Sequence, residues 1–118
     1  MCYTVIQTPN FKKDIKYYLK KHYMGILDVV KEIVDEVESG NLVGEVIQDL
    51  KLPAGEDTYK VRAVNPDLNK GKSGGYRIIY YAIKNDKEAY MLSIYSKKDS
   101  NRILEDRDIV ELIKEYCS

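Results

Sequence analysis

The sequence has few of the residues that build common metal centres and nucleophilic catalytic sites. His22 is the single histidine, and the two cysteines, Cys2 and Cys117, stand near opposite ends of the 118 residues. Neither cysteine has CxxC-type spacing, so we expect no structural zinc site and no cofactor. A Ser-His-Asp or Cys-His site would depend on His22, inside a lysine-rich segment, and we set that class of enzyme aside.

Long apolar runs are also missing. No stretch approaches the roughly 20 apolar residues that a membrane-spanning helix needs. The segment from Met1 to Val5 has neither the basic start nor the apolar core of a signal peptide. We therefore expect a cytoplasmic protein that does not bind membranes. In that compartment Cys2 and Cys117 are expected to stay reduced rather than form a disulfide.

What the sequence does have is enough apolar residues for a core and many charges. It is 44% hydrophobic and 32% charged, and its length suits one domain over residues 1–118. The formal net charge of zero hides a segregation: residues 11–22 carry +4, residues 28–57 carry −7 and residues 60–99 carry +5. Because binding of a polyanion depends on the local charge, the neutral total does not exclude a nucleic-acid partner.

The first forty residues are typical of a strand followed by a helical hairpin. Cys2 to Gln7 predicts a short strand, and Thr8-Pro9 combines a capping hydroxyl with a proline at the first helical position. Apolar residues then recur at helical spacing on both sides of a break at Gly25. Ser39-Gly40 is a helix-stop signal that ends the second helix.

The remainder predicts mostly strands. Extended segments are indicated near Val46, at 58–64, at 76–83 and at 89–95, and a short helix precedes the C-terminus. The expected fold class is α+β: a βαα hairpin, then an antiparallel sheet of three to four further strands, then a short C-terminal helix.

Strand alternation sorts the side chains of this region into two faces. Lys60 and Arg62 share one face of their strand, opposite Tyr59, Val61 and Ala63. In the last strand the same rule places Tyr90, Leu92 and Ile94 on one face and Ser93, Tyr95 and Lys97 on the other. If the apolar faces pack on the helices, the opposite face is exposed to solvent. Lys60, Arg62, Tyr95 and Lys97 then lie on one surface, and Arg77 joins them if its strand runs between.

Such a surface suits the cleavage of RNA without a metal ion. Guanidinium and ammonium groups stabilise the charge that builds on a scissile phosphate, and tyrosines stack on unpaired bases. A base must still take the proton from the 2′-hydroxyl, and here it would be a Lys or Tyr whose pKa neighbouring cations depress. The competing interpretation is an ordinary solvated sheet face that carries lysines for solubility.

These segments resemble the RelE/ParE superfamily of bacterial toxins, and most closely its HigB-like branch. The resemblance rests on the order of four motifs: Gly44-Glu45-Val46-Ile47-Gln48, Lys60-Val61-Arg62, Gly74-Gly75-Tyr76-Arg77-Ile78-Ile79-Tyr80-Tyr81 and Leu92-Ser93-Ile94-Tyr95-Ser96-Lys97-Lys98-Asp99. With the βαα start, it covers nearly the whole chain.

The resemblance implies the toxin of a type II toxin–antitoxin system, a RelE-like fold and a ribosome-dependent mRNA endoribonuclease acting in the ribosomal A site. It also implies a cognate antitoxin with a helix-turn-helix DNA-binding domain. By position, Arg77 would stabilise the transition state and Lys60 and Arg62 would bind RNA phosphate, with Lys60 a candidate base. Tyr95, Lys97 and Lys98 would complete the catalytic site, and Lys70 and Lys72 would contact RNA.

Two other functions fit the same residues. One is a ParE-like inhibitor of DNA gyrase, which has the same fold but cleaves no nucleic acid. The other is a binding module, a former toxin that has lost its activity and still binds its partner. The basic, tyrosine-bearing face favours the nuclease, because a gyrase inhibitor has no need of groups that stabilise a cleaved phosphate. The acidic second helix is expected to face away from the RNA.

Overall fold

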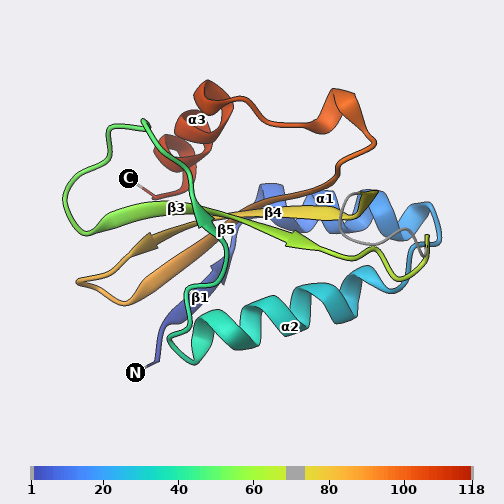
Figure 1. The fold of residues 1–118 in the computed structure, drawn as a ribbon, viewed down its shortest axis with the longest axis horizontal. Coiled ribbons are helices and arrows are strands. Elements are labelled where there is room, and N and C mark those ends of the chain that lie inside the picture. Colours follow the sequence, from blue (N-terminus) through green and yellow to red (C-terminus); the bar gives the residue numbers. More distant parts are fainter. Residues whose placement is uncertain (1, 69–73, 118) are drawn as a thin grey trace.

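A computed structural model describes residues 2–68 and 74–117 (Figure 1). A five-stranded sheet carries two helices on one face and one helix on the other. The elements in chain order are β1 (Thr4–Gln7), α1 (Pro9–Lys20), α2 (Ile26–Glu38), β2 (Glu45–Val46), β3 (Glu56–Ala63), β4 (Tyr76–Ile83), β5 (Glu88–Ser96), the 3-10 helix η2 (Ser100–Arg102) and α3 (Asp106–Cys117). The expected α+β fold is confirmed. Among the described residues, no helix has the length and apolar character to cross a membrane.

The sheet has the strand order β1-β5-β4-β3-β2. The pairs β2–β3, β3–β4 and β4–β5 are antiparallel, as expected from their short connections. The pairing of the first strand was not part of the expectation: β1 pairs parallel to β5, with Thr4 opposite Glu88 and Gln7 opposite Met91. Parallel pairing is possible because residues 8–87, with the helical hairpin and three strands, separate β1 from β5, so no tight turn has to join them.

The helical hairpin forms where the sequence predicted it. Thr8 caps α1, its Oγ1 accepting a hydrogen bond from the Phe11 amide, and Pro9 is the first helical residue. The chain leaves α2 through Gly40, whose φ of 96° is readily adopted only by glycine. The start of α1 and the end of α2 thus lie at residues whose chemistry explains the boundary.

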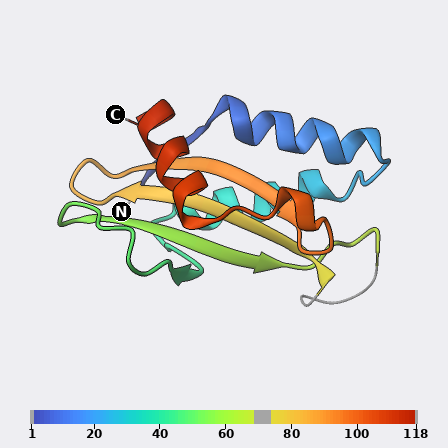
Figure 2. The ribbon, with the colours of Figure 1, turned by 90° about the horizontal axis from the view of Figure 1, so that it is seen from above.

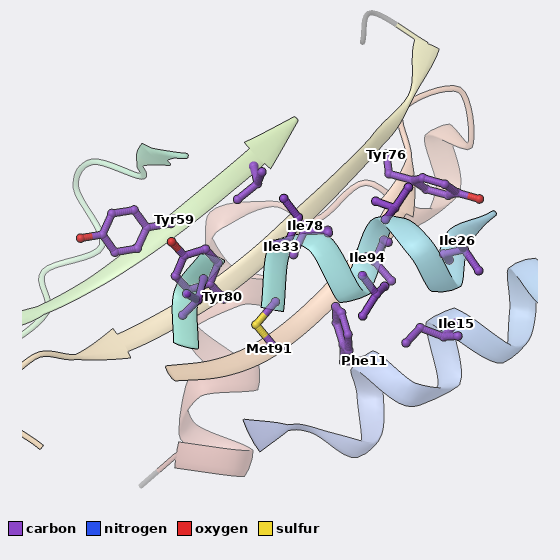
Figure 3. Close-up of a cluster of buried hydrophobic side chains, with 14 of the residues drawn as sticks. Phe11, Ile15, Ile26, Ile33, Tyr59, Tyr76, Ile78, Tyr80, Met91 and Ile94 are labelled. Carbon is purple, nitrogen blue, oxygen red and sulfur yellow. The ribbon is translucent and has the colours of Figure 1, made fainter. Parts of the chain in front are cut away.

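One core lies between this hairpin and the sheet (Figure 3). Phe11 of α1 and Ile26 and Ile33 of α2 pack on side chains from β3, β4 and β5, including Ile78 and Ile94. Figure 3 shows these residues pointing into the layer between the hairpin and the strands. At roughly 1.5–3 kcal/mol for each fully buried large apolar side chain, this layer supplies most of the stabilisation.

The opposite face of the sheet was expected to be exposed, and this is wrong over much of its area. Helix α3 lies across it (Figure 2), and Ile109 and Ile113 pack on Ile79, Tyr81 and Leu92. All of β4 from Tyr76 to Ala82 is buried. Strand alternation alone cannot reveal this cover, because α3 comes from a distant part of the sequence.

The assignment of faces in β5 is also corrected. The register between β4 and β5 shifts at Ile79/Tyr80, where Ser93 opposes Ile79 but Met91 opposes Tyr80. Leu92 is the extra residue of this β-bulge. Tyr90 and Leu92 consequently belong with Tyr95 in the α3-side core, whereas Ile94 lies in the core beneath the hairpin.

Candidate functional site

Three predicted site residues form a row across three neighbouring strands. Arg62 of β3 lies directly opposite Arg77 of β4, and Arg77 lies directly opposite Tyr95 of β5. Paired residues project to the same face of a sheet with Cβ atoms roughly 4.5–5.5 Å apart. The Arg62–Arg77–Tyr95 row therefore brings together side chains that the sequence separates by up to thirty-three positions, and it lies on the α3 side of the sheet.

Arg77 is the buried centre of this row. Only 5% of it is exposed, whereas Arg62 is exposed to solvent. The Nη1 of Arg77 donates a hydrogen bond to the backbone oxygen of Tyr76 at 3.1 Å. Burial lowers the pKa of Arg77 from its ordinary value, and the like charge of Arg62 lowers it further. Two arginines directly opposite each other repel, so a bound anion would be stabilised between them.

Tyr95 is even less exposed, at 3%. It packs in the α3-side core, where Leu104 is one of its partners, and the segment between η2 and α3 passes over this part of the sheet (Figure 2). Burial raises the pKa of Tyr95, and the smaller effect of the Arg77 charge does not reverse this. We expected neighbouring cations to depress the pKa of a catalytic Tyr, and for Tyr95 that expectation is wrong.

The remaining predicted cations lie around the row. Lys60 is partly exposed on β3 and lies opposite Ile79, two residues from Arg62 and on the same face. Lys97 and Lys98 are exposed directly after β5, where the amide of Lys97 donates to the backbone oxygen of Gly75 at 3.0 Å. Lys97 is thereby fixed beside the start of β4. Lys70 and Lys72, predicted to contact RNA, lie outside the described residues.

Gly75 explains part of the Gly-Gly motif before β4. A Cβ built on this residue would lie 2.0 Å from the backbone oxygen of Ala63, well inside the contact distance of real atoms. Only glycine lets the start of β4 approach the end of β3 this closely. The approach sets the register that puts Arg77 opposite Arg62 two residues later.

Helix α1 holds the end of β5 by a row of polar side chains. Beyond Met91 strand β1 no longer pairs with β5, and α1 bonds to the free strand edge instead. Thr8 and Asn10 donate to the backbone oxygens of Met91 and Leu92. Asp14 accepts from the Ile94 amide at 3.1 Å, and the Tyr18 hydroxyl accepts from the Ser96 amide at 2.7 Å. These bonds satisfy buried backbone groups that would otherwise be unpaired.

Two of these α1 residues also fix the corner after β5. The Asp14 carboxylate accepts from Arg102 at 2.7 Å, and Arg102 stacks over the Tyr17 ring, 3.8 Å from its centroid. Tyr18 donates its hydroxyl hydrogen to Asp99. The corner that carries Lys97 and Lys98 is therefore anchored at both Asp99 and Arg102.

The role of Asp14 was missed, although the sequence carried a signal for it. Asp14 is the one acidic residue among the lysines of 11–22, and it falls at helical spacing with Phe11, Ile15 and Tyr18. These four residues are the buried ones of α1. A carboxylate on an apolar stripe requires hydrogen-bond donors inside the protein, and here they come from β5 and Arg102.

A groove of about 580 Å³ lies between α2 and the outer edge of β3 and adjoins the row. Its lining combines the carboxylates of Asp28, Glu32 and Glu45 with the cations of Lys60 and Arg62. Because the groove carries both signs of charge, the concentration of positive charge is greater at the Arg62–Arg77–Tyr95 row and the lysines around it. Among the described residues, no three His, Cys, Asp or Glu side chains gather closely enough to hold a metal ion.

The arrangement of strands and helices defines a known class of α+β fold. No protein-family model matches this sequence, and no curated protein matches it. A solved structure does match: the toxin RelE of E. coli in the free state, as a variant with two arginines replaced by alanine. The TM-score is 0.53 with 19% sequence identity, over 98% of this chain and 99% of that one. At that identity the similarity shows that this chain has a RelE-like fold.

Proposed function

We propose that this chain is the toxin of a type II toxin–antitoxin system, of the HigB-like branch, and that it cleaves mRNA in the ribosomal A site. The observation that carries the proposal is the Arg62–Arg77–Tyr95 row on a RelE-like fold. The E. coli protein of that fold is described as a toxin. Two arginines and three lysines lie on this sheet face or next to it: Arg62, Arg77, Lys60, Lys97 and Lys98. This concentration of positive charge supports a polyanionic substrate.

The row can stabilise the transition state of RNA cleavage by 2′-hydroxyl attack. The attacking oxygen forms a bond to phosphorus as the bond to the 5′-oxygen breaks, and negative charge increases on the phosphoryl oxygens. In this proposal Arg62 and Arg77 donate to those oxygens, each with a planar fork of N–H groups. Because the two guanidiniums repel each other, a phosphate between them also relieves that repulsion.

The proton of the 2′-hydroxyl needs an acceptor. The raised pKa of Tyr95 keeps its hydroxyl protonated, so Tyr95 is not the base. Lys60 is the candidate, on the same face as Arg62 and partly exposed. We assign Tyr95 the role of packing beside Arg77, and Lys97 and Lys98 that of holding the RNA where it enters the site.

The partners follow from the same proposal. The substrate is mRNA on the ribosome, and a cognate antitoxin with a helix-turn-helix DNA-binding domain would neutralise the protein in the cytoplasm. The positive surface is suited to a partner that presents carboxylates to Arg62, Lys97 and Lys98 in place of RNA phosphates.

The test is to incubate the purified protein with ribosomes programmed with a defined mRNA and to map the new 5′ ends. We expect cleavage at codons in the A site. Equal cleavage of the same mRNA without ribosomes would overturn the ribosome dependence. No cleavage, together with inhibition of DNA supercoiling by gyrase, would replace the proposal with the ParE-like alternative.

A further inference from the structure

Helix α1 carries a stripe of lysines that the candidate site does not use. Lys12, Lys16 and Lys20 recur every four residues, Lys13 lies beside them, and all four are exposed. With a rise of about 1.5 Å per residue, the ammonium-bearing positions repeat about every 6 Å along one side of the helix. The buried residues of α1, such as Phe11 and Tyr18, occupy the opposite side.

These lysines are not neutralised within the protein. Two lysines elsewhere pair closely with carboxylates: Lys31 with Asp35 at 2.7 Å and Lys84 with Asp57 at 2.8 Å. No ion pair among the described residues includes a lysine of the stripe. The only acid of α1, Asp14, is turned inward to β5 and Arg102.

The stripe has a physical cost for the free protein. Like charges four residues apart on a helix repel each other, and α1 has no acid in its first turn to offset its positive N-terminal end. A surface that is strained by its own charge in the free state is stabilised when a polyanion binds to it.

The C-terminal end of the stripe lies near the basic end of the candidate site. At the end of α1, Lys21 follows Lys20 and reaches Asp99 at 4.0 Å, directly after Lys97 and Lys98. A ligand that extends along α1 could therefore contact both surfaces. The evenly spaced lysines are suited to the phosphates of a helical strand, which also recur at regular intervals, and lysines read phosphate without reading sequence.

We propose that the lysine stripe of α1 is a second binding surface, which docks the protein on the phosphate backbone of helical ribosomal RNA. This proposal rests on the proposed function, since it takes the ribosome as the place of action. The stripe supplies affinity and orientation, while cleavage is left to the Arg62–Arg77–Tyr95 row. The two surfaces are joined through the anchored corner at Asp99.

The experiment compares two triple variants in binding to purified empty 70S ribosomes. The first is Lys12→Gln with Lys16→Gln and Lys20→Gln, and the control is Lys31→Gln with Lys84→Gln and Lys114→Gln, which removes the same total charge elsewhere. Glutamine has about the helix propensity of lysine and removes the repulsion, so the stripe variant should melt no lower than wild type.

We expect the stripe variant to bind ribosomes at least about tenfold more weakly at 0.1 M salt, with a salt slope smaller by about 2. The control should bind like wild type. Unchanged ribosome binding by the stripe variant, or an equal loss in both variants, would overturn the proposal. The proposal would also be overturned if the stripe variant lost binding to vesicles of anionic lipid but bound ribosomes like wild type.

The same proteins separate this proposal from the proposed function. If the stripe docks the protein, the stripe variant should regain wild-type mRNA cleavage when its concentration saturates the ribosomes. Weakened ribosome binding by that variant, with no cleavage by wild type at any concentration, would support the stripe and overturn the nuclease. A stripe variant that stays inactive at saturation would place the lysines in the chemistry and contradict the docking role.

Discussion

The Tyr18 hydroxyl accepts a hydrogen bond from the Ser96 amide at 2.7 Å, joining the last turn of α1 to the last residue of β5. The same hydroxyl donates to Asp99 at 2.8 Å. A helix side chain thus replaces a neighbouring strand at the point where the sheet edge would be open. This link fixes the corner next to the candidate site, because Lys97 and Lys98 lie between the two residues that Tyr18 holds.

The first prediction compares two tyrosines that undergo the same chemical change. Tyr18→Phe leaves the buried Ser96 amide without its acceptor, so we expect the free energy of unfolding to fall by about 1–3 kcal/mol. Tyr76 is equally buried and its ring is 5.4 Å from that of Tyr18, but its hydroxyl has no hydrogen-bond partner among the described residues. Tyr76→Phe should therefore be neutral or slightly stabilising. Urea denaturation of both variants measures the difference.

Equal stability of the two variants would contradict the anchoring role of Tyr18. The link also has a functional consequence. If the Tyr18 bonds position Lys97 and Lys98, Tyr18→Phe should weaken RNA binding under conditions in which the variant is still fully folded, and Tyr76→Phe should not.

The second prediction concerns the pH dependence of stability through Asp14. Burial raises the pKa of Asp14 above its ordinary value of 3.8, and the bonds from Ser93, Ile94 and Arg102 only partly offset this. The folded protein therefore keeps a proton on Asp14 at pH values where the unfolded chain has lost it. The contribution of Asp14 to stability is then largest below its ordinary pKa and decreases as the pH rises through the raised pKa.

Asp14→Asn tests this sign because asparagine does not ionise in that range. We expect the unfolding free energy of wild type minus that of Asp14→Asn to decrease as the pH rises above the ordinary pKa of 3.8. Urea denaturation at several pH values measures this difference. A difference that increases with pH would show that Arg102 and the β5 amide outweigh burial and hold the pKa below its ordinary value.

The third prediction concerns the pH dependence of cleavage. The pKa of Tyr95 is raised, so its hydroxyl should not serve as the base, and Tyr95→Phe should lower the cleavage rate by less than about tenfold without changing the shape of the pH–rate profile. Tyr90→Phe, a change on the same strand outside the row, is the matched control. Loss of a titrating limb of the profile in Tyr95→Phe alone would make Tyr95 the base after all.

The elements could be predicted because local chemistry determines them. The run of β-branched and aromatic residues from Tyr76 to Ile83 gives β4 its bounds, and the Thr8-Pro9 pair starts α1. The Arg62–Arg77–Tyr95 row could be anticipated too, since Arg62 and Tyr95 share a face with Arg77 once β4 is placed between β3 and β5.

What could not be predicted depends on contacts between distant parts of the chain. The bulge at Leu92 leaves no mark in the local sequence, so strand alternation put Tyr90 and Leu92 on the wrong face. The apolar stripe of α3, with Ile109 and Ile113, was visible, but not which face of the sheet it covers. The packing of α3 on the sheet buries Tyr95, and it covers part of the sheet face that was expected to be solvated.

The central claim is that Arg77 stabilises the transition state of mRNA cleavage, and one rate measures it directly. Single-turnover cleavage on programmed ribosomes should fall at least about 100-fold in Arg77→Ala, the usual effect of removing a charge-stabilising donor. Arg107→Ala, at an exposed arginine of α3 that lies 3.7 Å from Glu105, should cleave like wild type. Both variants should show a cooperative thermal unfolding transition, as a folded protein does. When expressed in cells, each should arrest growth in proportion to its cleavage rate. A folded Arg77→Ala variant that cleaves at the wild-type rate would contradict the account.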